Sequence, residues 1–261
     1  MSDVSIVTVE EVDPSLAPDT LIVRLNRPHK RNALSADLKR ELAATARHLA
    51  ERTDIGAVIL TGAGGSFCAG NDISEPDSFA QDLPLVEARR HIRLGLDMCR
   101  AWESMPQLTI AAVDGFAIGG GISLALSCDF RILHCGAWLR APEVELGITY
   151  SWGTLPRLTR LIGPARAKLV AGLCRKVDSG TALDWGLCEE VCDDTLKAAL
   201  AMAGEITSKP RVAQHMVKEA IGRLSAGPDT ATLEQDQVLL NMSDPEAKKL
   251  QQEALDRMGR T

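Results

Sequence analysis

Runs of apolar β-branched and aliphatic residues, bounded by polar or turn-forming residues, predict five buried strands. They cover residues 4–10, 20–25, 55–61, 108–113 and 128–133. Pro14 and Pro18 lie between the first two strands, so the chain opens with a hairpin-like pair. Apolar residues at helical spacing predict two helices, over 36–52 and 85–105. Ser35 stands where a side-chain cap would start the first of these helices.

The second part of the chain changes from mixed strands and helices to helices alone. Helical spacing predicts segments over 154–161, 164–171, 179–185, 194–208, 210–224 and 229–257. We therefore expect an α/β fold with a body over residues 1–200 and a helical C-terminal region over residues 201–261. The sequence has no internal repeat of fixed period.

Composition and charge narrow the class of protein. Of the 261 residues, 45% are hydrophobic and 25% are charged, as in an ordinary globular protein with one large core. A net charge of −6 disfavours a nucleic-acid partner, and no uninterrupted apolar run is long enough to span a membrane. The first residues lack a basic segment followed by an apolar one, so we expect a cytoplasmic protein without a secretory signal.

Cysteine and histidine spacing gives no indication of a metal site. The seven cysteines are scattered and include no CxxC pair, which is typical of small core residues in a reducing compartment. The five histidines include no HxxxH pair. The sequence therefore predicts that the protein holds no metal.

Three consecutive glycines, Gly119 to Gly121, mark the first candidate for chemistry. They follow the buried strand 108–113 and open an apolar helical pattern that begins near Ile122. Backbone N–H groups at a helix start have no intrahelical acceptor, and the helix dipole favours negative charge there. The turn could hold an oxyanion. The alternative is a tight strand-to-helix turn that binds nothing.

Two loops offer further backbone and basic groups. The loop over 62–73 follows a strand but has Phe67 where a dinucleotide-binding GxGxxG motif needs its third glycine, so we interpret Gly70 to Asp72 as a turn that presents an N–H inward. The loop over 26–35 is strongly basic. The loop is either solvated or in contact with a phosphate group. The candidates for a phosphate contact are Arg27, Lys30 and Arg31.

Glu143 is the candidate acid/base. It stands between Pro142 and an apolar stretch that ends at Ile148, where burial would raise the pKa of the carboxyl group toward neutrality. An isolated glutamate is otherwise a surface residue, and the sequence context alone leaves both interpretations open.

Five motifs, in this order and spacing, resemble the crotonase (enoyl-CoA hydratase/isomerase) family. They are Asn26-Arg27-Pro28 with Asn32-Ala33-Leu34, the segment 66–73, the segment 110–121, Ala141-Pro142-Glu143 and the segment 158–163. The resemblance spans nearly the whole chain and implies a crotonase-type spiral of ββα units with a helical C-terminal region. It also implies an acyl-CoA substrate, a homotrimer or hexamer, and no cofactor, since coenzyme A is part of the substrate.

The resemblance assigns roles to particular positions. Two backbone N–H groups, those of Asn71 and Gly120, would hold the thioester carbonyl oxygen. Lys30 would contact coenzyme A, and Ala69 and Ile73 would line the path of its adenine and pantetheine parts.

One departure from the family pattern affects the predicted reaction. Hydratases of the family have two acidic residues that place and deprotonate water, and here the first of them is replaced by Ser123 while Glu143 remains. A single carboxylate suffices to move a proton between C2 and C4 of an enoyl-CoA. The resemblance therefore favours double-bond isomerisation over hydration, although Ser123 could still hydrogen-bond a water molecule.

Three other functions remain as alternatives, two of them enzymatic and one non-catalytic. The serine–glutamate pair also resembles hydratase-lyases that act on aromatic enoyl-CoA thioesters, but Tyr150 is the only tyrosine and their C-terminal tyrosine has no counterpart. A serine hydrolase using Ser123 would need a glycine at Ala125 to complete the nucleophile elbow. A non-catalytic acyl-CoA-binding or RNA-binding member would lack Glu143 or show a basic face.

Overall fold

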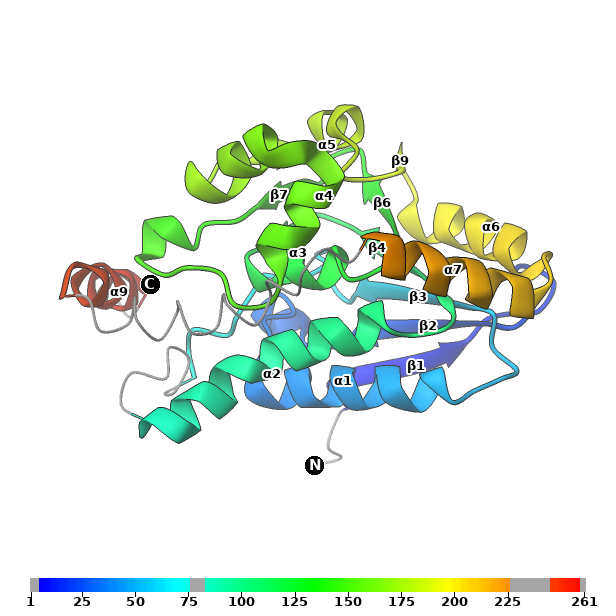
Figure 1. The fold of residues 1–261 in the computed structure, drawn as a ribbon, viewed down its shortest axis with the longest axis horizontal. Helices are drawn as coiled ribbons and strands as arrows, with labels where there is room; N and C mark the ends of the chain where they lie inside the picture. The colour runs from blue at the N-terminus through cyan, green and yellow to red at the C-terminus, as the bar shows by residue number, and fades with distance from the viewer. Residues whose placement is uncertain (1–4, 76–82, 226–244, 259–261) are drawn as a thin grey trace.

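A six-stranded sheet forms the centre of the computed structural model, which describes residues 5–75, 83–225 and 245–258 (Figure 1). The strand order is β1-β2-β3-β4-β6-β9. The strand bounds are β1 Val7–Glu11, β2 Thr20–Leu25, β3 Ala57–Gly62, β4 Leu108–Val113, β6 Phe130–His134 and β9 Glu190–Cys192. β1 runs antiparallel to β2, with Val7 opposite Leu25, and the other neighbours are parallel. The expected opening pair and all five predicted strands are present.

The two faces of this sheet belong to two apolar clusters, because successive side chains of a strand point to opposite faces. In β2, Leu21 and Val23 pack in the cluster that includes α1 (Ala36–Ala50) and α2 (Leu85–Glu103). Ile22 packs in the second cluster, with α6 (Thr195–Thr207). Helices thus cover both faces, and a sheet covered on both faces explains the continuous apolar strand sequences.

A second, three-stranded sheet was not expected from the sequence. Its strands have two or three residues each: β5 (Phe116–Ile118), β7 (Trp138–Arg140) and β8 (Val177–Asp178). β5 pairs in parallel with β7, and β7 pairs antiparallel with β8. Strands this short have no periodicity to detect, and they form because segments distant in the chain supply their hydrogen-bond partners.

The predicted helices are present within the described residues, with small shifts of their ends. Ser35 caps α1, since its side chain accepts a hydrogen bond from the Leu38 N–H. The helices not yet given are α3 Gly120–Ala125, α4 Thr154–Ala167, α5 Ser179–Trp185, α7 Arg211–Ser225 and α9 Pro245–Met258, with the short η1 Pro28–Lys30, η2 Val144–Leu146 and η3 Lys168–Gly172. The helix expected over 229–257 is described only as α9, and its residues 229–244 lie outside the described residues. None of the described helices combines the length and apolar character needed to cross a membrane.

Two helices expected over 154–161 and 164–171 are joined in the structure. α4 continues across Gly163, whose backbone is non-helical (φ 74°, ψ 165°), and Pro164 then starts the next turn. Glycine adopts this conformation without a Cβ clash, and proline is tolerated at the first position of a helical segment. The break falls between the two predicted helices, which therefore meet at a kink at Gly163.

α6 contains the position at which we expected the body to end. It spans residue 200 and packs on β3, β4 and β6. The division into residues 1–200 and 201–261 stays a prediction.

Candidate active site

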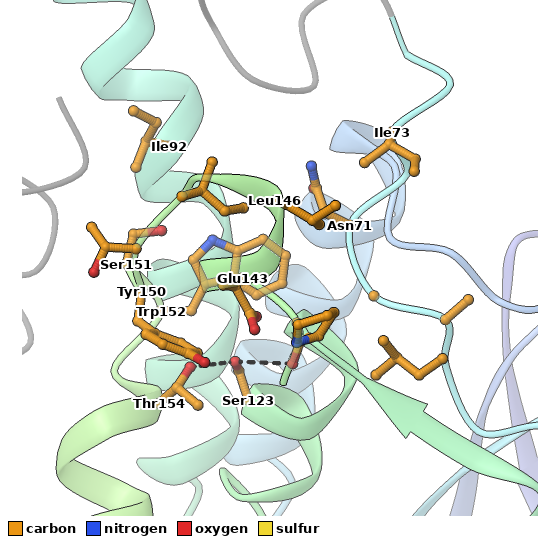
Figure 2. A pocket seen from close by; sticks show the side chains of 18 of the residues that line it. Asn71, Ile73, Ile92, Ser123, Glu143, Leu146, Tyr150, Ser151, Trp152 and Thr154 are labelled. Carbon is orange, nitrogen blue, oxygen red and sulfur yellow. Dashed lines mark hydrogen bonds between the residues drawn. The ribbon is translucent and has the colours of Figure 1, made fainter. Parts of the chain in front are cut away.

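A pocket of about 250 Å³ lies where the loop after β3, the start of α3 and the segment after β7 meet (Figure 2). The predicted site residues that line it are Ala69, Asn71, Ile73, Gly120, Ser123 and Glu143. The remaining predicted residue, Lys30, does not line it. The fold therefore brings together residues from three of the five sequence motifs.

The glycine turn places the Gly120 N–H at the start of α3. Gly119 is the N-cap residue, with φ +52°, and the N–H groups of Ile122 and Ser123 both return to its carbonyl oxygen. The Gly120 N–H precedes these bonds and has no intrahelical acceptor. A methyl group on Gly70 would lie 3.5 Å from the Gly120 nitrogen and 2.7 Å from the Ile118 oxygen, so the loop after β3 packs directly against this turn.

Asn71 presents its backbone N–H from the facing loop. An isolated parallel bridge joins Asn71 to Leu34, made by the Gly70 oxygen with the Leu34 N–H at 2.7 Å and by the Asp72 N–H with the Leu34 oxygen at 3.1 Å. In a parallel bridge the central residue directs its own N–H away from the partner. The Asn71 N–H therefore points away from Leu34, and Asn71 lines the pocket. Two N–H groups from facing loops are the arrangement that stabilises a carbonyl oxyanion.

Glu143 directs a buried carboxylate against the glycine turn. A methyl group on Gly119 would lie 3.1 Å from Glu143 Oε1, and Oε2 is buried with no hydrogen-bond partner among the described residues. Burial raises the pKa of Glu143 to about 7, and hydrogen bonds from its own backbone N–H and from the Tyr150 hydroxyl oppose this effect only partly. Near neutral pH the carboxyl group can both accept and donate a proton, as general acid/base catalysis requires.

Ser123 is buried in α3 and hydrogen-bonded to a second hydroxyl group. Its Oγ lies 2.6 Å from Thr154 Oγ1, which comes from the first residue of α4 (Figure 2). Both side chains line the pocket. A neutral hydroxyl pair thus occupies the position where the resemblance led us to look for a second acidic residue.

Trp152 was missed by the sequence analysis. Its indole ring fills the space between two glycines, since a methyl group on Gly95 of α2 or on Gly120 would come within 1.9 or 2.0 Å of ring atoms. The ring also lines the pocket. The sequence signal for this contact was Gly95, in the middle of the helix predicted over 85–105, because a glycine at such a position usually has a packing reason.

Lys39 was also missed, because it lies within the first predicted helix. It is 2% exposed, on the buried side of α1 with Leu42 and Ala46, and its side chain lines the pocket. Its Nζ donates to Asn71 Oδ1 at 2.9 Å and lies 5.4 Å from the centroid of the Trp152 ring. The signal in the sequence was a lysine at an apolar position of an amphipathic helix.

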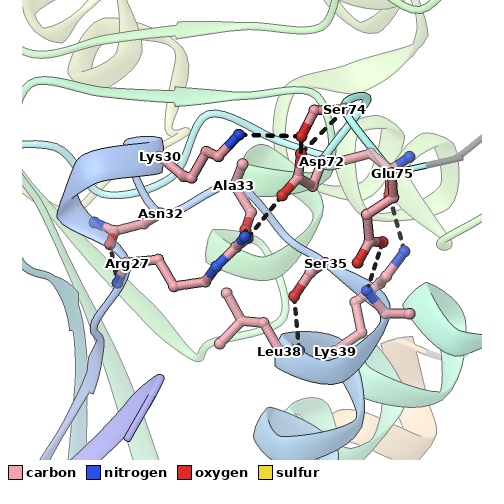
Figure 3. A network of polar contacts seen from close by, with 12 residues as sticks. Arg27, Lys30, Asn32, Ala33, Ser35, Leu38, Lys39, Asp72, Ser74 and Glu75 are labelled. Carbon is pink, nitrogen blue, oxygen red and sulfur yellow. Dashed lines mark hydrogen bonds and ion pairs between the residues drawn. The ribbon is translucent and has the colours of Figure 1, made fainter. Parts of the chain in front are cut away.

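The basic loop divides into structural and exposed residues (Figure 3). Arg27 pairs with Asp72 at 2.9 Å and also donates to the Ala33 oxygen, so it joins the two loops rather than facing solvent. Lys30 is exposed, and its Nζ lies 3.3 Å from Ser74 Oγ. Its role as a coenzyme A contact stays a prediction.

Within the part of the chain that the structure describes, folding creates one cluster of metal-ligating groups that sequence spacing did not indicate. His134 and Cys135, at the end of β6, lie near Asp193, and one ligand atom from each falls within 4.8 Å of the others. Cys135 is exposed, and none of the three residues lines the pocket. The expectation that the protein uses no metal stays a prediction.

The chain is similar, in sequence and in fold, to known enoyl-CoA hydratases and isomerases. The sequence profile of the enoyl-CoA hydratase/isomerase family matches residues 19–258. The chain is 38% identical to the short-chain-enoyl-CoA hydratase of Clostridium acetobutylicum over 214 residues, which is 80% of each chain. An enoyl-CoA hydratase structure from Bacillus anthracis superposes with a TM-score of 0.78 at 32% identity and covers 91% of this chain and 90% of that one. A monofunctional enoyl-CoA isomerase from M. smegmatis superposes with a TM-score of 0.71 at 29% identity, covering 87% and 98%. The chain has the crotonase fold, belongs to the enoyl-CoA hydratase/isomerase family and is an enzyme of that family.

Proposed function

We propose that this enzyme moves the double bond of an enoyl-CoA thioester between the 3,4 and 2,3 positions. One observation supports isomerisation above the others: Glu143 is the single carboxylate among the described residues that line the pocket. Isomerisation needs one group that removes a proton and returns it to another carbon. Hydration needs a group that also holds and activates a water molecule.

The reaction begins when Glu143 removes a proton from C2 of the 3-enoyl-CoA. The electron pair of the broken C–H bond delocalises onto the thioester oxygen, which accepts hydrogen bonds from the N–H groups of Asn71 and Gly120. Each such donor typically contributes about 10²–10³ to the rate. Glu143 then delivers the same proton to C4, and the double bond forms between C2 and C3. The two N–H groups stabilise the oxyanion and no redox step occurs, so the proposed steps use neither a metal nor a redox cofactor.

The environment of Glu143 suits both halves of this cycle. With a pKa of about 7, the carboxylate and the carboxylic acid have similar free energies at neutral pH. The proton can therefore be taken up and released without a large barrier.

Hydration is the second candidate. It is supported by the hydroxyl pair of Ser123 and Thr154, which could bind a water molecule, and by the hydratase names of the relatives from Clostridium acetobutylicum and Bacillus anthracis. A serine hydrolase has less support, since Ser123 lies inside α3 and its hydroxyl contacts Thr154 rather than a histidine.

The deciding experiment incubates the purified protein with matched 3-enoyl-CoA and 2-enoyl-CoA thioesters in deuterated water. Mass spectrometry follows the products and the deuterium at C2 and C4. We expect interconversion of the two enoyl-CoA thioesters to exceed formation of 3-hydroxyacyl-CoA at least tenfold. Faster formation of 3-hydroxyacyl-CoA would make hydration the function.

The enzyme is further proposed to be cytoplasmic and to assemble as a homotrimer or hexamer. The described residues of α7 include none that is buried, and its apolar side chains are 56–88% exposed at Val212, Met216, Val217, Ile221 and Leu224. An exposed apolar stripe of this kind is typical of a protein interface. Light scattering coupled to size-exclusion chromatography gives the mass, and a monomer at micromolar concentration would exclude the assembly.

A further inference from the structure

We infer that the acyl group bound in this pocket carries a carboxylate, and that the Lys39 ammonium is its counter-charge. The substrate class would be the coenzyme A monothioester of a short dicarboxylic acid. The inference rests on the proposed function in one respect, namely that the pocket holds the acyl part of a coenzyme A thioester.

Lys39 is unusual among the cations of this protein. Three lysine or arginine residues are buried in the described part of the chain: Lys39, Arg131 and Arg157. Arg131 binds a carboxylate oxygen of Glu189 at 2.6 Å, and Arg157 binds one of Glu103 at 2.5 Å. For Lys39, by contrast, no carboxylate oxygen of the described residues lies within 4.0 Å of Nζ. Burying a charge without a counter-charge is costly, so the site is incomplete as it stands.

The acidic residues whose charge acts on Lys39 already have other partners. Asp72 pairs with Arg27 and accepts hydrogen bonds from Ser74, while Glu75 accepts the Ala36 N–H at 2.9 Å (Figure 3). Both carboxylates act on Lys39 only through space, in the same direction, and the neighbouring Arg40 acts against them. We therefore place the missing partner in the pocket.

The ammonium has further N–H donors for such a partner. An ammonium group has three N–H donors, and the Asn71 amide oxygen uses one of them. The other polar contact is the face of Trp152, which is electrostatically attractive to a cation but accepts no second charge-assisted hydrogen bond. A carboxylate in the pocket would supply that bond and the counter-charge together.

The position of Lys39 limits the length of the acyl group. Its Nζ binds the side chain of Asn71, whose backbone N–H is proposed to hold the thioester oxygen. The ammonium thus lies only a few atoms from the thioester end of the pocket. The other ionisable residues of the pocket lining are Glu143, whose carboxylate packs against Gly119, His91 and Tyr150, and none of them is a second cation of fixed charge. A short acyl chain ending in a carboxylate would reach Lys39 within this volume.

Lys39 keeps its charge at physiological pH. Burial lowers the pKa of Lys39 to about 8, so most molecules have the ammonium form at pH 7. A bound carboxylate would raise this pKa again, because an opposite charge favours the ionised form.

The test measures binding of two saturated thioesters that the enzyme cannot isomerise, glutaryl-CoA and butyryl-CoA, by titration calorimetry at pH 7. We expect the full-length protein to bind glutaryl-CoA at least tenfold more tightly. Lys39→Met should remove this preference while changing butyryl-CoA affinity less than threefold, and Lys39→Gln should do the same if the first variant folds poorly. Arg40→Met removes one positive charge from the exposed side of the same helix, and it should keep the preference.

Two results would overturn the inference. One is equal affinity of the unmodified protein for both thioesters. The other is an equal loss of both affinities in the Lys39 variants, which would limit Lys39 to holding Asn71 in place. Neither measurement depends on turnover. A protein that prefers glutaryl-CoA but isomerises no enoyl-CoA would contradict the proposed reaction alone.

Discussion

Two ionisable side chains reach the same pocket from different parts of the fold and respond to burial in opposite ways. Glu143 comes from the segment after β7, and burial raises its pKa to about 7. Lys39 comes from α1, and burial lowers its pKa to about 8. The same physical effect, the cost of removing a charge from water, makes the first group exchange protons at neutral pH and leaves the second mostly charged. One cavity thus holds a proton carrier, Glu143, and a fixed charge, Lys39.

The largest effect is expected for Glu143→Gln, which keeps the shape of the side chain but cannot accept a proton. Turnover should fall by about 10²–10⁴, the usual contribution of a general acid/base, while acyl-CoA affinity changes only a few fold. The matched control is Glu145→Gln, since Glu145 is half exposed and pairs with Arg140. Full activity of the Glu143 variant would exclude the proposed mechanism.

Gly120→Ala should cause the second largest loss. The added methyl group would lie 2.0 Å from the Trp152 ring, so either the ring or the start of α3 must move. Displacing one oxyanion donor would lower kcat by about 10²–10³, and the overpacking would reduce stability by about 1–3 kcal/mol.

Removing the Trp152 ring tests whether its clash with the added methyl group causes the loss of activity in Gly120→Ala. The double variant Gly120→Ala with Trp152→Ala should be more active than Gly120→Ala alone, and it should lose less stability than the sum of the two single variants, as kinetics and thermal unfolding would show. Wild-type activity of the single variant would mean that the ring yields freely and does not position the Gly120 N–H.

Thermal stability should separate the two ionisable groups by the sign of their pH dependence. Between pH 4.5 and about 7 the folded protein retains a proton on Glu143 that the unfolded chain releases, so stability falls as pH rises through this range. Glu143→Gln removes this dependence. The melting temperature of the variant minus that of the wild type should therefore increase by a few degrees from pH 5 to pH 8.

Lys39→Met should show the reverse trend. Between about pH 8 and pH 10.5 the unfolded chain keeps a proton that the folded protein lacks, so the wild type recovers stability as pH rises. The melting-temperature advantage of the variant should be largest below pH 8 and should shrink above it. Parallel trends for the two variants in differential scanning fluorimetry would contradict opposite pKa shifts at Glu143 and Lys39.

The smallest effect is expected for Ser123→Ala. The variant loses one neutral hydrogen bond to Thr154, worth about 0.5–1.5 kcal/mol, so isomerisation should slow by no more than about tenfold. Both isomerisation and hydration are measured on the same preparation, with deuterium followed into C2. A selective collapse of hydration, with exchange at C2 intact, would identify Ser123 as a water ligand and favour the hydratase.

The sequence by itself determined the strands, the helix cap and the residues placed by local motifs. The strand over 108–113 appears with the expected bounds, and Ser35 caps α1 as its position predicted. The glycine turn and Glu143 were identified as candidates because a helix start and a proline-flanked carboxylate are local features. Both lie in the pocket.

Only the tertiary structure decided what surrounds these residues. Lys39, Asn71 and Trp152 are distant in the chain, and each has an ordinary explanation where it stands: a helix, a loop and an aromatic residue. Their contacts form because α1, the loop after β3 and the segment before α4 are packed together. The short strands β5, β7 and β8 likewise depend on distant partners. Burial, and therefore each shifted pKa, is a property of the assembled pocket, which local sequence patterns do not encode.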